Sequence, residues 1–168
     1  MSGAPQIIPG GVPDSPRRRI QASTRLLHEW SVMQPWDAPP MYELRLGPTP
    51  LSANAHNITP AIERMLRVFN RYADMVGITP TEIQVIEAKV VAEPGAISQL
   101  QHYVDLVHTT PLVQQYAGRI VQGVLLFAVN DPIIAQRAGA AGLRVIVFTP
   151  DWVQDYLNLK YFRRQAAK

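Results

Sequence analysis

A carboxylate and an amine stand two residues apart near the end of an apolar segment, residues 83–89. Side chains at positions i and i+2 of a β-strand point to the same face, so Glu87 and Lys89 should project together. Burying such charges is costly unless they have a partner or a task. In isolation, the two residues are also typical of a weak ion pair on the exposed face of a half-buried strand. Their meaning therefore depends on the residues around them.

A second carboxylate, Asp74, lies in a preceding strand-like segment, residues 71–78. The four residues in between, 79–82, have the composition of a turn. If they form the loop of a hairpin, Asp74 lies directly opposite Glu87. Such like charges are destabilising, and a divalent cation between the oxygens relieves the repulsion. A three-residue loop would instead put the carboxylates on opposite faces, and Asp74 would be an ordinary hairpin residue.

A helix is predicted after Pro94 and Gly95, because apolar residues recur at helical spacing. The stripe expected to enter the core consists of Ile97, Leu100, Val104 and Val107. On an adjoining face, Gln99 and Tyr103 are four residues apart and so lie one above the other. Considered alone, they would be the polar shoulder of an amphipathic helix.

In this order, Asp74, Glu87-Ala88-Lys89 and the Gln99-x-x-x-Tyr103 motif resemble the PD-(D/E)xK nuclease superfamily. The similar branch is that of the RecB-type nucleases, whose helix after the Glu-x-Lys strand carries Gln-x-x-x-Tyr. The resemblance covers roughly residues 58–129 and departs from the motif at position 73, where alanine replaces proline. It implies a restriction-endonuclease-like α/β fold, with a central mixed sheet flanked by helices, and a metal-dependent nuclease that hydrolyses DNA phosphodiester bonds.

The resemblance also implies a role for each motif residue. Asp74 and Glu87 would hold Mg²⁺, with Mn²⁺ as an alternative, helped by the Ala88 carbonyl. The metal would polarise the scissile phosphate and lower the pKa of a bound water. Lys89 would position or activate that water, or stabilise the charge of the transition state. The Gln99 and Tyr103 side chains would orient the metal site or the nucleic-acid backbone.

Superfamily members carry a further acidic residue from an earlier element. This chain offers Glu29, Glu43 and Glu63 for that role. Glu63 would lie near the start of a helix, whereas Glu43 lies in the strand-like residues 41–46. Glu43 is slightly favoured.

The composition agrees with one domain and narrows the function. A chain of 168 residues with 47% hydrophobic content can bury one core. Its pI of about 9.4, with a net charge of +3, is compatible with a nucleic-acid or other polyanionic partner, and the resemblance implies DNA. The absence of cysteine excludes disulfides and thiolate metal sites, and the four histidines lack ligand spacing. The chain has no Gly-x-Ser-x-Gly, Walker or Gly-x-Gly-x-x-Gly pattern, which argues against serine hydrolases and phosphate-loop proteins.

No apolar stretch reaches transmembrane length, and the N-terminus lacks the features of a signal peptide. We therefore expect no membrane partner. The expected location is the cytoplasm, or a virus particle assembled there.

The elements that must position the motif follow from periodicity and breakers. Helices are predicted over residues 17–33, 59–70, 131–142 and 152–164, and residues 35–40 break the first of them. A strand is predicted over residues 42–46, a short helical connection over 111–118, and buried strands over 121–129 and 143–148. The alternation of strands and helices in the second half implies a partly parallel sheet.

Residues 1–16 contain four prolines and three glycines and predict an extended arm, ahead of a single domain over residues 17–168. Such an arm lacks the apolar periodicity to bury itself and would contact neighbouring subunits. This leads to a second hypothesis: a structural protein, such as a virion or head-tail connector component built on a nuclease-like fold. It would form a homo-oligomer or a larger assembly through residues 1–16, and the sequence alone does not separate it from an active nuclease.

Overall fold

The computed structural model describes residues 16–48 and 71–166, with side chains for residues 20–48 and 71–160. The predicted arm lies outside these residues except for Pro16, which begins the first helix. The predicted helix over residues 59–70, with Glu63, also lies outside them.

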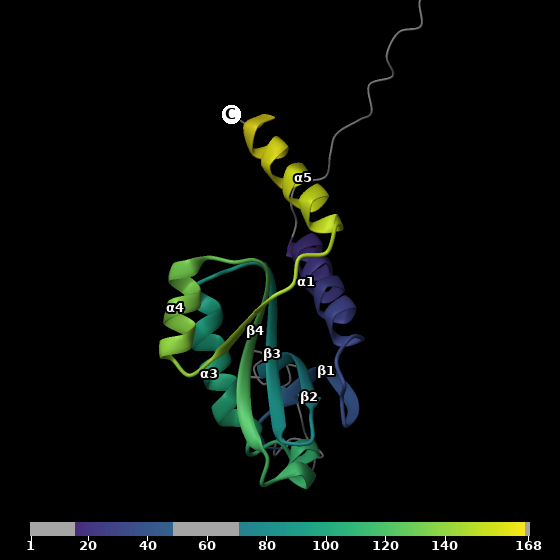
Figure 1. The fold of residues 1–168 in the computed structure, drawn as a ribbon, viewed down its shortest axis with the longest axis vertical. Coiled ribbons are helices and arrows are strands. Elements are labelled where there is room, and N and C mark those ends of the chain that lie inside the picture. The colour runs from purple at the N-terminus through teal and green to yellow at the C-terminus, as the bar shows by residue number, and fades with distance from the viewer. Residues whose placement is uncertain (1–15, 49–70, 167–168) are drawn as a thin grey trace, which may run out of the picture.

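Within the described residues, a mixed five-stranded sheet forms the centre of the protein, with helices on both of its faces (Figure 1). The strands are β1 (Ala38–Leu46), β2 (Arg71–Ile78), β3 (Glu82–Val91), β4 (Ile120–Val129) and β5 (Arg144–Val147), in this order across the sheet. The helices are α1 (Pro16–Ser31), α3 (Gly95–Val107), α4 (Pro132–Ala140) and α5 (Trp152–Ala166), and a 3₁₀ helix, η2 (Pro111–Tyr116), precedes β4. None of the helices formed by these residues is long and apolar enough to cross a bilayer.

Strands β1, β2 and β3 are antiparallel neighbours, whereas β4 runs parallel to β3, and β5 runs parallel to β4. The predicted α/β class and the partly parallel sheet are therefore confirmed. The arrangement is consistent with a restriction-endonuclease-like fold.

The sheet separates two apolar cores (Figure 1). On one face, Leu100 and Val107 of α3 pack with Val85 of β3. On the other face, Leu26 of α1 packs with Ile86 of β3. β4 is buried on both faces from Gly123 to Ala128, as its continuous apolar sequence predicts.

The first strand differs from the prediction. Residues 35–40 were expected to break the first helix, with the strand beginning at residue 42, yet β1 begins at Ala38 and includes Pro39 and Pro40. β1 lies at an edge of the sheet, where a missing N–H costs no ladder hydrogen bond. The register with β2 is irregular between Ala38 and Met41, around these prolines.

The last strand also differs from the prediction. A buried strand was expected over residues 143–148, but β5 spans only Arg144–Val147 and forms the other edge of the sheet. Val147 is 50% exposed. The apolar pattern predicted the strand correctly but not its edge position, because pattern alone does not report which strands have two neighbours.

Gly77 provides a test of packing beneath the hairpin. A Cβ atom at Gly77 would lie 2.3 Å from Cζ3 of Trp36, whose indole N–H donates a 2.9 Å hydrogen bond to the carbonyl of Ser31. The ring is therefore held in place, and Gly77→Ala should lower the free energy of unfolding by about 1–3 kcal/mol. Gly139→Ala in α4 is the control, because its Cβ would meet nothing within 4 Å. It should raise stability by up to about 1 kcal/mol. Urea unfolding measures both, and an unchanged Gly77→Ala protein would contradict this packing.

Candidate active site

The β2–β3 hairpin has the register that the motif requires. Ile78 pairs with Ile83 and Val76 with Val85, as the four-residue loop predicts. The ladder continues to Met75 opposite Ile86. Residues 74 and 87 come next along the two strands, so the hairpin brings Asp74 to the level of Glu87.

Glu87 and Lys89 form a close ion pair on β3. Lys89 Nζ lies 2.5 Å from Glu87 Oε1. The Glu87 side chain is only 1% exposed, and that of Lys89 is 26% exposed. An exposed surface pair is therefore excluded, because this carboxylate belongs to the interior of the protein.

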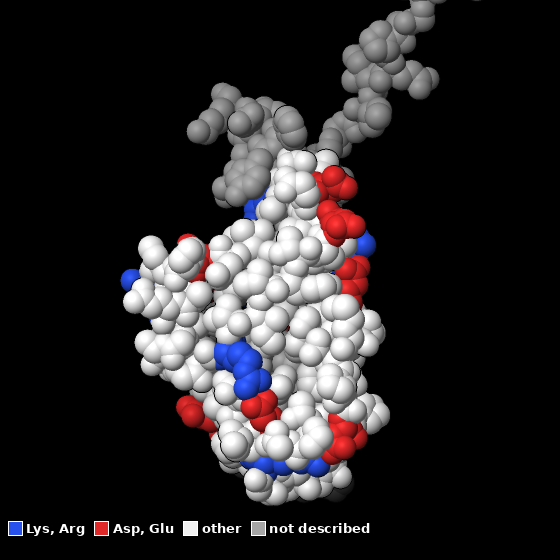
Figure 2. Space-filling view, viewed as in Figure 1, with Lys and Arg blue, Asp and Glu red and all other residues white. Residues whose placement is uncertain are grey.

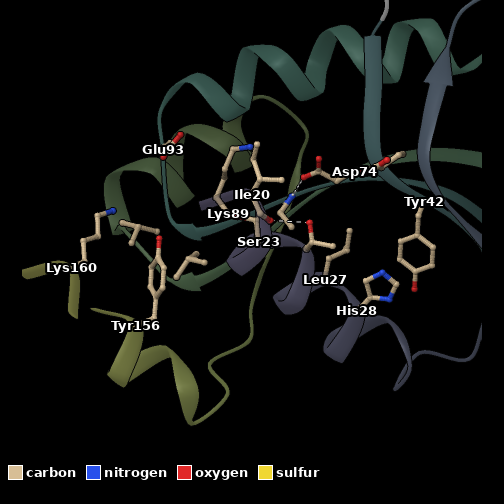
Figure 3. Close-up of a pocket in the computed structure, with 15 residues that line it drawn as sticks. Ile20, Ser23, Leu27, His28, Tyr42, Asp74, Lys89, Glu93, Tyr156 and Lys160 are labelled. Carbon is tan, nitrogen blue, oxygen red and sulfur yellow. Dashed lines mark hydrogen bonds between the residues drawn. The ribbon is translucent and has the colours of Figure 1, made fainter. Parts of the chain in front are cut away.

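Asp74 is tied to β3 through the backbone of the motif. The N–H of Ala88 donates a 2.9 Å hydrogen bond to Asp74 Oδ2, drawn as a dashed line beside Asp74 in Figure 3. This bond fixes the carboxylate of Asp74 at the segment that carries Glu87 and Lys89. Sharing of one cation by the two carboxylates stays a prediction.

Helix α3 completes the constellation. The side-chain amide of Gln99 donates a 2.9 Å hydrogen bond to the hydroxyl of Tyr103, as their four-residue spacing predicts. Tyr103 is only 6% exposed and belongs to the core between α3 and the sheet. Burial raises the pKa of Tyr103, Gln99 lowers it, and the charge of Glu87 raises it further. The charge of Asp74 raises the pKa of Tyr103 too, so both carboxylates of the hairpin influence this hydroxyl of α3.

The electrostatics of Glu87 are unusual for a glutamate. Burial and the charge of Asp74 raise its pKa, and the charge and hydrogen bond of Lys89 and the Gln99 side chain lower it, with a net rise to about 7. The free-energy cost of removing the carboxylate from water therefore exceeds the stabilisation of its charge by Lys89 and Gln99. Glu87 holds a proton over part of the physiological pH range in the metal-free protein.

The pKa values of Asp74 and Lys89, the two charged neighbours of Glu87, are raised for different reasons. Burial raises the pKa of Asp74, and the Ala88 hydrogen bond and Lys89 only partly oppose this. For Lys89, burial would lower the pKa, but the charge and hydrogen bond of Glu87 and the charge of Asp74 outweigh it, so the pKa is raised. Lys89 is therefore a cation at neutral pH.

One buried oxygen in this cluster is unsatisfied. Glu87 Oε2 has no hydrogen-bond partner among the described residues. A buried acceptor without a partner costs about 1–3 kcal/mol, and more when it is charged. Two carboxylates, one of which has this unpartnered oxygen, and a backbone carbonyl are suitable ligands for Mg²⁺, which commonly uses one or two carboxylates and completes its shell with water and phosphate. No group of three or more His, Cys, Asp or Glu side chains within residues 20–48 and 71–160 could hold a metal. The chain would thus supply only part of the coordination shell.

Of the two candidates for the additional acidic residue that the structure describes, Glu43 is the better placed. It lies between the pairs Tyr42–Met75 and Leu44–Ala73, at the level of Asp74, and its charge raises the pKa of Asp74. Its φ of 47° is uncommon for a non-glycine residue, and strained backbone of this kind gathers at functional sites.

Glu29 is engaged elsewhere. It accepts hydrogen bonds from the Arg25 side chain at 2.7 Å and from the Trp152 indole at 2.8 Å. This leaves Glu43 as the candidate from the described residues.

A cleft that no local sequence pattern predicts lies beside these residues. It has a volume of about 430 Å³ and lies between α1, α5 and the sheet (Figure 3). Its lining includes Ser23 and Leu27 of α1, Tyr156 and Lys160 of α5, and Glu43, Asp74 and Lys89 of the sheet. Periodicity predicted both helices, but no local pattern reports that helices more than 100 residues apart close over one site.

Comparison with protein-family models, with curated proteins and with solved structures finds no match to this chain. The class that the fold defines is an α/β protein with a mixed sheet flanked by helices. Its function rests on the chemistry of the site.

Proposed function

We propose that the protein is a metal-dependent nuclease that hydrolyses DNA phosphodiester bonds. The observation that carries the proposal is the carboxylate of Glu87, which is 1% exposed and has one oxygen without a hydrogen-bond partner among the described residues. It lies next to Lys89 and in the electrostatic field of Asp74. A buried acid with a raised pKa and an unused oxygen contributes little to packing, and such groups cluster at functional sites.

Asp74, Glu87 and the Ala88 carbonyl are the groups that would hold Mg²⁺ or Mn²⁺. When bound, the metal would polarise the scissile phosphate and lower the pKa of a coordinated water. The pKa of Glu87 is raised to about 7, so the part of Glu87 that is protonated near neutral pH must release its proton to become a ligand. Metal affinity should therefore fall as the pH drops below about 7.

Lys89 acts as a positive charge rather than as a base in this proposal. Its raised pKa keeps the amine protonated at neutral pH. A protonated amine cannot accept a proton from water, but it can donate a hydrogen bond to a phosphate oxygen as negative charge develops there.

Gln99 and Tyr103 contribute to the site from α3, where their side chains form a hydrogen bond. Because the Tyr103 hydroxyl accepts the hydrogen bond from Gln99, its own proton stays available for another acceptor. We assign both side chains a positioning role.

The assembly role rests on residues 1–16, of which the structure describes only Pro16, so it stays a prediction beside the proposed nuclease.

Metal titration tests this proposal. Asp74→Asn should weaken Mn²⁺ or Mg²⁺ binding about tenfold or more, because affinity depends on the number of charged ligands. Asp105→Asn is the control, since Asp105 is exposed on α3 and outside the site. Isothermal titration calorimetry in two buffers of different ionisation enthalpy should also detect proton release.

The same proteins should then be assayed on labelled DNA with Mg²⁺ and with EDTA. Cleavage that depends on Mg²⁺ and stops with EDTA is expected for the wild type and for Asp105→Asn. Cleavage that survives EDTA, or equal metal affinity in both variants, would contradict the proposal.

A further inference from the structure

The cleft extends away from the candidate metal ligands. Hydrolysis of a phosphodiester does not by itself require this additional space. Figure 3 shows Lys160 and Tyr156 on one side, His28 and Tyr42 on the other, and Lys89 between them. Its volume of about 430 Å³ lies within the range of small-molecule sites, roughly 300–1,000 Å³.

The position of α1 limits what can enter. α1 packs over the β3 face through Leu26, and its residues Ile20, Ser23 and Leu27 line the cleft together with Lys89. An intact duplex is too wide for a chamber of this volume. Enzymes whose target lies in such a chamber act on single strands or take a nucleotide out of the stack.

We propose that this cleft binds one unpaired nucleotide of the substrate beside the scissile phosphate, so that the enzyme acts on single-stranded or frayed DNA. This inference rests on the proposed nuclease function, because the bound nucleotide is placed relative to Asp74 and Lys89.

The lining has two chemical parts that suit a nucleotide. Leu27, Val90 and the Tyr156 ring provide an apolar wall for a base, which packs on such surfaces without regard to sequence. Lys160 provides a positive charge away from Asp74, for a phosphate that neighbours the scissile one.

The charges of the cleft also limit how much DNA it holds. Glu43 and Glu93 line it too, and their negative charges would repel an extended run of phosphates. On the face of the described residues shown in Figure 2, Lys and Arg form small separate groups beside Asp and Glu. A protein that grips a long duplex needs many phosphate contacts, whereas these features favour a single nucleotide.

Helices α1 and α5, which line the cleft, are held together by a hydrogen bond and a cation–π contact. Glu29 of α1 accepts a hydrogen bond from the Trp152 indole of α5, at 2.8 Å, and another from Arg25, at 2.7 Å. The Arg25 guanidinium also lies 4.6 Å from the centre of the Trp152 ring. These contacts fix α5 against α1, so the cleft is formed before substrate arrives, which lowers the entropy cost of binding.

A bulky residue in the cleft tests the inference. Ser23→Trp should fill the chamber, and Lys160→Ala should remove its distal charge. Gln21→Trp is the matched control, because Gln21 is exposed on the same helix and does not line the cleft. Circular dichroism first verifies that each full-length variant is folded.

Cleavage of a single-stranded oligonucleotide is compared with cleavage of a covalently closed duplex, both with Mg²⁺. The wild type and Gln21→Trp should cleave the single strand at least about tenfold faster than the closed duplex, and Ser23→Trp and Lys160→Ala should each lose about tenfold on the single strand. Equal rates on both substrates, or full activity of Ser23→Trp, would overturn the cleft inference and leave the nuclease function intact.

Binding gives a second readout that does not need turnover. Fluorescence anisotropy with Ca²⁺ in place of Mg²⁺ should show weaker binding of the single strand to Ser23→Trp, by about tenfold, with Gln21→Trp unchanged. If the wild type cleaves neither DNA, the nuclease proposal fails, and anisotropy alone decides the cleft. Equal affinity of Ser23→Trp and Gln21→Trp for the single strand would then overturn the inference.

Discussion

Replacement of Lys89 by methionine should lower Mg²⁺-dependent DNA cleavage about 100- to 1,000-fold, the usual effect of removing one preorganised donor from a transition state. Methionine is unbranched and similar in length to lysine, and the lysine side chain is 26% exposed, so the fold should persist. The rate constant under single-turnover conditions is the measurement. Calorimetric titration with Mn²⁺ verifies that the metal site survives.

Lys89→Arg separates charge from proton transfer. If Lys89 acts through its positive charge, arginine should retain more activity than methionine, although its larger head group will not match the geometry. If Lys89 instead removes a proton from water, arginine should be as inactive as methionine, because guanidinium does not deprotonate. A Lys89→Met protein with wild-type activity would refute any role for this side chain in the reaction.

The hairpin of the site could be predicted from sequence because three local signals agree. Apolar alternation sets which residues face the core, the 79–82 turn sets the loop length, and the loop length sets the register of Val76 with Val85. The helical spacing of Gln99 and Tyr103 likewise predicts their contact. Each of these relations is confined to neighbouring elements.

Long-range relations could not be predicted in this way. The contact of Glu29 with Trp152 spans 123 positions, and no periodicity reports it. The same holds for the edge position of β5, which depends on the whole order of the sheet. The positive φ of Glu43 is equally hidden, because the sequence there is that of an ordinary strand.

The charge of Glu87 should make the metal-free protein less stable as the pH rises. Burial and the charge of Asp74 together raise its pKa from the ordinary 4.5 to about 7. Between these values, the folded state keeps a proton that the unfolded chain has released, so the free energy of unfolding falls with increasing pH. The shift corresponds to a loss of about 3 kcal/mol, complete above pH 7.

Glu87→Gln should therefore stabilise the metal-free protein at pH 8 by about 1–3 kcal/mol, with the difference vanishing near pH 4.5. Removal of one partner from a buried ion pair is usually harmful. Here Lys89 is partly exposed and still lies near the negative charge of Asp74 after the substitution. The pKa of Glu87 is raised even though the attraction of Lys89 lowers it. The desolvation cost of the carboxylate outweighs that attraction. Urea unfolding in EDTA from pH 4.5 to pH 8 measures the difference.

Glu82→Gln is the control, because the pKa of Glu82 is shifted in the opposite direction to that of Glu87. Hydrogen bonds from Arg144 lower the pKa of Glu82, so its contribution to stability is present above the unfolded pKa and is lost as the pH falls through the folded one. This variant should be less stable than the wild type at pH 8.

Saturating Mg²⁺ should then stabilise the wild type and Glu82→Gln, by about 2.7 kcal/mol at 100 times Kd, but not Glu87→Gln. A Glu87→Gln protein that is less stable than the wild type at pH 8, or that still gains stability from Mg²⁺, would show that this carboxylate is held for the fold rather than for a metal.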